Sequence, residues 1–275
     1  MIRFVRRFAA VFLASLAIAL PARATTFSVD FTDIWWNALE DGWGVTVSQQ
    51  GDIIFATFFI YGPDSSARWF SAALFPVAGS SSVVTFSGDL FRSSGSFYGD
   101  PNFRKLSGVK AGTATMTFNS AVTGTLMYNI DGVSVTKQIT RQTFRNNNLA
   151  GRYVGGMVGI ASNCRDVNQN GYATILGNVI VTQTDPTIVM EIDFFTSTGA
   201  AAACTFRGSY TPLGRVGTIS NGTWTCVVGS TTTNQGTTFS MTNIDGQANG
   251  FHATFTGTDQ FCNYNGRFGG VRDAN

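Results

Sequence analysis

Most of this chain alternates between short runs rich in β-branched and aromatic residues and turns that contain glycine or aspartate. Residues 44–50 and 53–61 flank Gly51-Asp52, and residues 124–130 and 133–144 flank Asp131-Gly132. This is the spacing of tight β-hairpins. After the first 24 residues, no apolar stripe repeats with the 3.6-residue period of a helix. We therefore expect an all-β protein.

The chain divides into two halves that follow the same scheme. Residues 145–148, RNNN, separate a half without cysteine from a half that holds all four cysteines. Each half contains about eight strand-like runs with short connections, which favours an antiparallel meander. The sequence predicts two consecutive antiparallel meander β-barrels, or two strongly bent β-sandwiches. The expected domains are a Trp-rich one at residues 25–147 and a disulfide-containing one at residues 148–275.

The first 24 residues have the features of a secretory signal peptide. A basic segment, MIRFVRR, precedes the apolar run FAAVFLASLAIAL and the site Ala22-Arg23-Ala24, which is typical of a cleaved leader. No later run approaches the roughly 20 apolar residues of a transmembrane helix. We expect an exported protein without a transmembrane segment, periplasmic or extracellular, that begins at Thr25.

The charge balance argues against nucleic-acid binding. Of the 18 lysines and arginines, four arginines lie in the leader, which leaves 14 basic against 16 acidic residues. The only lysines are Lys105, Lys110 and Lys137. A slightly acidic chain lacks the basic stripe that binding to a phosphate backbone requires.

The four cysteines of an exported chain predict two disulfides. A hairpin that turns near residues 213–216 places Cys204 opposite Cys226. In a closed up-and-down barrel the first strand lies beside the last, which brings Cys164 to Cys262. We therefore predict these two pairs. A zinc site would need close C-x-x-C pairs, which are missing.

Groups that could transfer protons are scarce. The single histidine, His252, lies in a strand-like run and has no evident catalytic partner. Two pairs of acids could serve a carboxylate-based glycosidase: Glu40 with Asp41, and Glu191 with Asp193. The second pair would share one face of a strand, which could equally be a solvated face with Ile192 and Phe194 directed inward.

DVNQNG, residues 166–171, matches the first half of a calcium loop. Asp166, Asn168 and Asn170 stand at alternating positions before a glycine. An EF-hand would need a glutamate where Gly177 stands, together with flanking helices. A polar turn is the favoured interpretation, with a weak calcium site as the alternative, and we expect no cofactor.

Residues 31–144 carry a family pattern. They contain WWNALEDGWG, QQGDIIFATFF and SGDLFRSSGS, then VKAGTATMTF and VSVTKQITRQTF. This series resembles a family of secreted proteobacterial β-rich modules that run as WWxN, ExGWG, QGD, FAxxF and ITRQxF. The resemblance implies an exported β module and no particular activity. Ala38 and Asp41 stand where that family pattern has proline and serine.

A looser similarity is to calycin-type barrels such as lipocalins and avidins. They open with Gly-x-Trp on the first strand, and an arginine from a late strand packs over that ring. Gly42-Trp43-Gly44 and Arg141 match this pattern, which implies that Arg141 stacks on Trp43 as a cation–π pair. Trp43 would then be the buried aromatic that fills the closed end.

The adjacent Trp35 and Trp36 must point to opposite sides of an extended chain, so one of them should line a surface or a pocket. We expect an aromatic-lined cleft for a small apolar molecule or a glycan. The residues expected to line it are Trp35, Trp36, Asn37, Glu40, Trp43, Tyr61, Trp69 and Arg141. We expect a binding or interaction protein rather than an enzyme, and the alternatives are a carboxylate-based hydrolase and a structural envelope or matrix protein.

Overall fold

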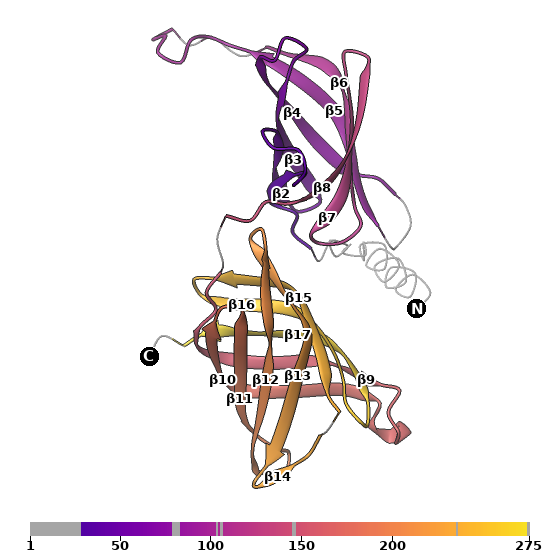
Figure 1. Ribbon diagram of the computed structural model, residues 1–275, viewed down its shortest axis with the longest axis vertical. Helices are drawn as coiled ribbons and strands as arrows, with labels where there is room; N and C mark the ends of the chain where they lie inside the picture. Colours follow the sequence, from indigo (N-terminus) through magenta and orange to yellow (C-terminus); the bar gives the residue numbers. More distant parts are fainter. Residues whose placement is uncertain are drawn as a thin grey trace, which may run out of the picture.

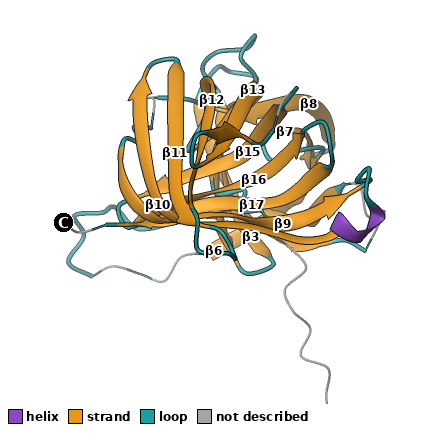
Figure 2. Cartoon of the chain, turned by 90° about the horizontal axis from the view of Figure 1, so that it is seen from below, coloured by secondary structure: helices purple, strands orange, loops and turns teal. Residues whose placement is uncertain are grey.

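The computed structural model describes residues 29–78, 83–102, 104, 107–144, 147–234 and 236–273. The predicted signal peptide, residues 1–24, lies outside these residues. The described chain forms two closed antiparallel β-barrels, one after the other in sequence (Figure 1). Strands make up almost all of it, and the one short helical turn is seen in Figure 2. The predicted fold class is confirmed, and closure selects barrels over sandwiches.

The first barrel follows chain order around its wall, and β1 meets β8 to close it. Its strands are β1 (Asp33–Trp36), β2 (Gly44–Gln50), β3 (Ile53–Tyr61), β4 (Ala67–Pro76), β5 (Val84–Ser94), β6 (Ser107–Phe118), β7 (Thr123–Ile130) and β8 (Val133–Arg141).

The second barrel is closed by pairing of β9 with β17 and of β12 with β13. Its strands are β9 (Gly151–Ser162), β10 (Gly171–Thr184), β11 (Thr187–Phe195), β12 (Ala201–Leu213), β13 (Val216–Val228), β15 (Thr238–Gln247), β16 (Gly250–Thr258) and β17 (Asn263–Arg272). The two-residue strand β14 (Thr231–Thr232) pairs with the end of β13, and the 3-10 turn η1 (Val167–Gln169) follows β9.

Both predicted tight hairpins are present. Gln50 pairs with Ile53 around Gly51-Asp52, and Ile130 pairs with Val133 around Asp131-Gly132. Gly51 has a φ of 61°, and Asp131 and Gly132 have φ values of 50° and 87°. Two successive positive φ angles define a type I′ turn, which explains the Asp-Gly sequence there.

Alternation along the strands fills both barrels with side chains. In β3 every second residue from Ile54 to Phe58 is buried, while Phe55 and Phe59 face outward. This is the period-2 pattern of a strand with one face on a core. The two interiors form separate hydrophobic clusters, one in each barrel.

The two barrels close with seams of different length. In the second barrel, β17 pairs with β9 from Asn263 opposite Ser162 to Arg272 opposite Tyr153. In the first, β1 meets β8 only where Trp35 faces Arg141 and Trp36 faces Thr140. Residues 133–139 of β8 therefore have a strand partner on one side only, which is β7.

Both predicted disulfides are confirmed. Cys164 is bonded to Cys262 and Cys204 to Cys226. The second pair depends on a β-bulge. The turn pairs Leu213 with Val216, and this register continued along the hairpin would bring Cys204 opposite Thr225.

The register shifts between Arg207 and Ser209, because β13 has an extra residue there. Asn221 lies in this bulge with a φ of 56°. Because the bulge leaves this extra residue out of the regular pairing, Cys204 lies opposite Cys226 and Phe206 lies opposite Trp224. A one-residue slip would otherwise turn the facing side chains to the wrong side of the sheet.

Candidate functional site

The end of the first barrel that faces the second barrel, here called the base, is filled by aromatic rings and one arginine. Phe31 stacks on Phe118 with ring centres 3.8 Å apart, and Trp35 lies 4.9 Å from Phe118. Trp35 has no exposed surface, and its Nε1 donates to the carbonyl of Phe31. The base is closed by these side chains.

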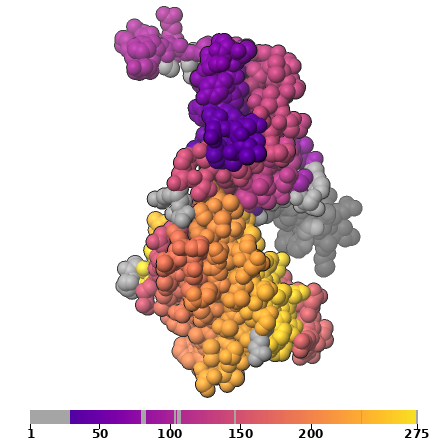
Figure 3. Space-filling view, in the orientation of Figure 1, coloured from indigo at the N-terminus to yellow at the C-terminus, as the bar shows by residue number. Residues whose placement is uncertain are grey.

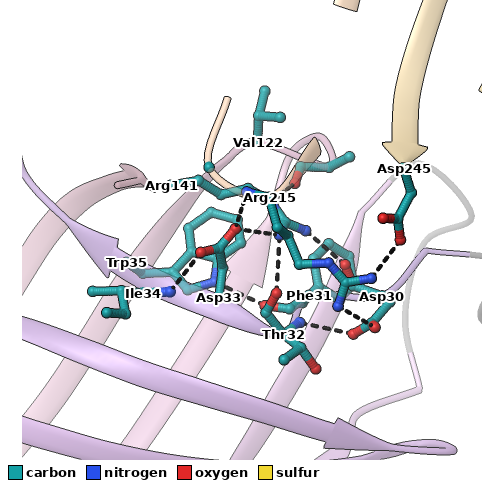
Figure 4. A network of polar contacts seen from close by, with 12 residues as sticks. Asp30, Phe31, Thr32, Asp33, Ile34, Trp35, Val122, Arg141, Arg215 and Asp245 are labelled. Atoms are coloured by element: carbon teal, nitrogen blue, oxygen red, sulfur yellow. Dashed lines mark hydrogen bonds and ion pairs between the residues drawn. The ribbon is translucent and has the colours of Figure 1, made fainter. Parts of the chain in front are cut away.

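Arg141 covers this aromatic cluster and has a partner for every nitrogen. Its guanidinium lies 5.0 Å from the centre of the Trp35 ring. It donates to the carbonyls of Ala121, Thr32 and Asp30 and, at 2.9 Å, to the Asp33 carboxylate (Figure 4). Burial lowers the pKa of Arg141, and Asp33 opposes this effect.

The predicted stack of Arg141 on Trp43 is therefore wrong, because Arg141 stacks on Trp35. The barrel begins with β1, one strand earlier than expected, and β1 is the strand that pairs with β8. That pairing puts Trp35 directly opposite Arg141. Trp43 is not the buried aromatic of the closed end, since it is only partly buried.

The base also holds the second barrel in place. The turn between β12 and β13, Gly214-Arg215, lies against it, and the two barrels touch there in Figure 3. Asp33 accepts a hydrogen bond from the Arg215 amide at 2.8 Å, and the Arg215 side chain pairs with Asp30 and Asp245 (Figure 4). Burial opposes the charge of Arg215, but Asp245 and Asp30 raise its pKa above the usual value.

The opposite end of the first barrel contains an apolar pocket of about 430 Å³, here called the mouth pocket. Its floor includes the buried ring of Phe70, and its walls include Tyr128, whose ring lies edge-on to Phe58 at 5.8 Å. Burial raises the pKa of Tyr128. The residues that line the pocket are Ile60, Tyr61, Gly62, Pro63, Arg68, Phe70, Tyr128, Ile130, Asp131, Val133 and Val135.

Short strands explain why the mouth is open. β1 ends at Trp36 and β2 starts at Gly44, so neither strand extends beside residues 133–139 of β8, which lead to the mouth. The ends of β3 and β8 therefore border the pocket, through Ile60 and Val135. The turn after β3, with Gly62 and Pro63, and the turn before β8, with Asp131, both line the pocket.

The rim of the mouth pocket carries paired charges. Arg92 forms an ion pair with Asp131 and lies 5.5 Å from the centre of the Phe70 ring. Arg68 is 3.4 Å from Asp64 in a second ion pair. The pocket thus has an apolar interior with charged groups only at its edge, which is the usual composition of a small-molecule site.

The gap between β8 and β2 is filled by Trp43. Lys137 of β8 lies 5.8 Å from the centre of the Trp43 ring and forms an ion pair with Glu40. Glu40 also accepts from Trp43 Nε1 at 3.1 Å. The hydrogen bond from Lys137 is the main cause that lowers the pKa of Glu40.

The eight residues expected to form one cleft are spread over several separate places. Trp35 and Arg141 are buried in the base, and Tyr61 lines the mouth pocket. Glu40 and Trp43 lie at the gap beside β8. The other three are placed as follows: Trp36 at the end of β1, Asn37 in the turn after it, and Trp69 on the outer face of β4.

Sequence reasoning missed most of the mouth pocket. Its lining consists mainly of aliphatic residues such as Ile60, Ile130, Val133 and Val135, which look like ordinary strand residues. One signal was available, because the Asp131-Gly132 hairpin marks the end of two strands. The side chains next to such a turn lie at a barrel rim by necessity.

The candidate carboxylates are placed unfavourably for paired acid and base catalysis. Glu40 is held as a carboxylate by Lys137, whereas a general acid needs a raised pKa. Glu191 and Asp193 share the exposed face of β11, while Ile192 is buried and Phe194 packs against the core.

A shallow hollow of about 460 Å³ at one end of the second barrel includes Asp193 without Glu191. The hollow therefore does not bring two acids together.

The single histidine, His252, is exposed on β16 and lies opposite Asp245 of the neighbouring strand β15.

The calcium-like segment forms a polar turn. Asp166 caps η1 and accepts from the Asn168 amide at 3.0 Å, and Asn170 accepts from the Cys164 amide. The carboxylate and amide oxygens thus satisfy the turn itself. Among the residues that the structure describes, no group of three or more His, Cys, Asp or Glu has the arrangement of a metal site.

Comparison with known proteins gives no match to a protein-family model, to a curated protein or to a solved structure. Within the described ranges, none of the helical segments has the length and apolar character needed to cross a membrane.

Proposed function

We propose that this chain is an exported binding protein whose first barrel holds a small apolar molecule in the mouth pocket. The main support for the proposal is the mouth pocket itself, an open, mostly apolar hollow of about 430 Å³ at the end of the first barrel opposite the base. Ligand pockets commonly range from about 300 to 1,000 Å³. The mouth pocket is thus large enough for a small organic molecule.

Burial of apolar surface supplies the binding energy in this proposal. Each 100 Å² of apolar surface removed from water contributes about 2.5 kcal/mol. Phe70, Tyr128 and Ile130 offer such surface, and Asp131 with its partner Arg92 can orient a polar group at the rim. The paired rim charges favour a neutral or weakly polar ligand over a strongly charged one.

Export is supported by the two disulfides, since such bonds persist in oxidising compartments. The leader and the family resemblance in residues 31–144 point the same way. A hydrolase is not proposed, because Glu40 is paired with Lys137 and the Glu191 and Asp193 carboxylates face solvent.

The experiment is a titration with N-phenyl-1-naphthylamine, an uncharged probe whose fluorescence rises in apolar surroundings. Ile130→Trp places a large ring in the mouth pocket and should weaken probe binding at least 10-fold. Val154→Trp, on the exposed outer face of β9, is the matched control and should leave binding unchanged. Equal binding by the wild type and Ile130→Trp would contradict the proposal.

A further inference from the structure

A second feature of the first barrel is an uncharged aromatic surface on its outside, formed by the outward side chains of β2, β3 and β4. Phe55, Phe59, Trp69 and Phe75 are each more than half exposed there. Soluble proteins rarely leave so many large rings together in water, and a patch of this kind usually marks an interaction site. We call it the outer aromatic face. β2, β3 and β4 lie side by side in Figure 1.

Strand register arranges this face in rows. Phe59 lies directly opposite Trp69 on one side and opposite Gly44 on the other. Phe55 lies opposite Ala73, with Phe75 on the diagonal. Rows two residues apart are separated by about 7 Å along the strands.

A row of hydroxyl groups runs between the two groups of rings. Thr46 lies opposite Thr57, and Thr57 lies opposite Ser71. The face therefore alternates between aromatic rings and hydroxyl groups across its middle. Protein interfaces have a different arrangement, with apolar residues in the centre and polar residues at the rim.

No charged side chain belongs to the outer aromatic face. Its members are Thr46, Ser48 and Gln50 of β2, Ile53, Phe55, Thr57, Phe59 and Tyr61 of β3, and Ala67, Trp69, Ser71, Ala73 and Phe75 of β4. Binding to an anionic membrane relies on lysine and arginine, which this face lacks. Charged side chains lie at its border, where Lys110 and Asp89 form an ion pair on β6 and β5, and Arg68 and Arg92 line a hollow together with Trp69.

We infer that the outer aromatic face binds an uncharged glycan chain. A sugar ring has an apolar face of C–H groups that packs on an aromatic ring, and hydroxyls around its edge that bond to threonine and serine. A chain of such rings alternates these two kinds of surface. The rows of the outer aromatic face offer both, without a charge to desolvate. This inference does not depend on the mouth pocket, with which the outer aromatic face shares only Tyr61 at the rim.

The experiment is affinity electrophoresis of the full chain through gels that contain a neutral soluble polysaccharide, with hydroxyethylcellulose and a soluble mannan as probes. Retardation by at least one of them is expected. Phe59→Ser combined with Trp69→Ser should weaken binding at least 10-fold, and Thr57→Val should weaken it with the rings in place. Tyr172→Ser, a highly exposed aromatic of the second barrel, is the control and should bind like the wild type.

Three results would overturn the inference: no retardation in either gel, retardation that the variants of the face do not reduce, or a dimer in light scattering that Phe59→Ser with Trp69→Ser abolishes. The last result would assign the face to a second copy of the chain. Ile130→Trp should retain glycan binding, so failure of the mouth pocket and failure of the outer aromatic face are distinguishable.

Discussion

The guanidinium of Arg141 lies 5.0 Å from the centre of the Trp35 ring, and both side chains are buried. These two residues face each other across β1 and β8, where the first barrel closes. The cation–π contact and the ion pair with Asp33 therefore act at the short seam that completes the wall. We therefore expect closure of the first barrel to depend on this pair as well as on the two residue pairs of the seam.

Arg141→Ala should destabilise the first barrel by about 3 to 5 kcal/mol, the usual cost of removing one partner of a buried ion pair. It leaves Asp33 without its guanidinium and three backbone carbonyls without a donor. Urea unfolding followed by tryptophan fluorescence measures the change. Arg207→Ala on the exposed side of β12 is the control, and an equal effect of both variants would contradict this account.

Gly214→Ala should separate the two barrels. A Cβ at this position would lie 2.3 Å from Asp33 Oδ2 and 2.7 Å from Arg141 Cβ, and the φ of Gly214 is 65°. Gly229 has a similar φ of 61° with nothing within 4 Å, so Gly229→Ala carries the same backbone strain without the collision. Small-angle scattering should show a larger radius of gyration for Gly214→Ala alone. Identical scattering from the two variants would show that the turn is not held against the base.

Acid should weaken the contact between the barrels through Asp30. Burial alone would raise the pKa of Asp30, but hydrogen bonds from Thr32 and the charge of Arg215 bring it below the usual 3.8. A lowered folded-state pKa stabilises the folded form above pH 3.8, and this stabilisation disappears as the pH falls through the lower folded value. Asp30→Asn should therefore flatten the loss of stability below about pH 4 relative to the wild type. Parallel curves for the two proteins in thermal unfolding would exclude this role.

Deletion of Asn221 should keep the Cys204–Cys226 disulfide, because it removes the residue that the bulge absorbs. Ser209 pairs with Ser220 on the turn side, so without Asn221 the same register continues regularly to Cys204 opposite Cys226. Deletion of both Asn221 and Gly222 removes one residue too many and would bring Cys204 opposite Val227. Mass spectrometry after thiol alkylation should find no free cysteine in the single deletion and two in the double deletion, with Cys164 and Cys262 bonded in both. Two free cysteines in the single deletion would show that the bulge does not set the register.

Features carried by local sequence could be predicted. The Asp131-Gly132 and Gly51-Asp52 turns fixed two hairpins, and barrel closure brought Cys164 to Cys262. The alternation of adjacent residues also separated Trp35, which is buried, from Trp36, which is not. Each of these depends on neighbours in the chain or on the order of strands.

Features that depend on strand length and long-range register could not be predicted. The buried tryptophan that closes the base is Trp35 rather than Trp43, because β1 is only four residues long and still pairs with β8. The same short strand leaves the mouth open, so ordinary aliphatic residues such as Ile60 and Val135 line a pocket. Periodicity reports which side of a strand a residue faces, but it does not report where a neighbouring strand ends.

The most direct test of ligand binding in the mouth pocket is a methyl NMR titration of the full chain with N-phenyl-1-naphthylamine. The methyl signals of Ile60, Ile130, Val133 and Val135 should shift together with one dissociation constant. The signals of Ile188 and Ile192, buried in the second barrel, should stay in place. Saturable binding with shifts confined to the second barrel, or no shift at the four mouth residues, would contradict the claim that the first barrel is the binding site.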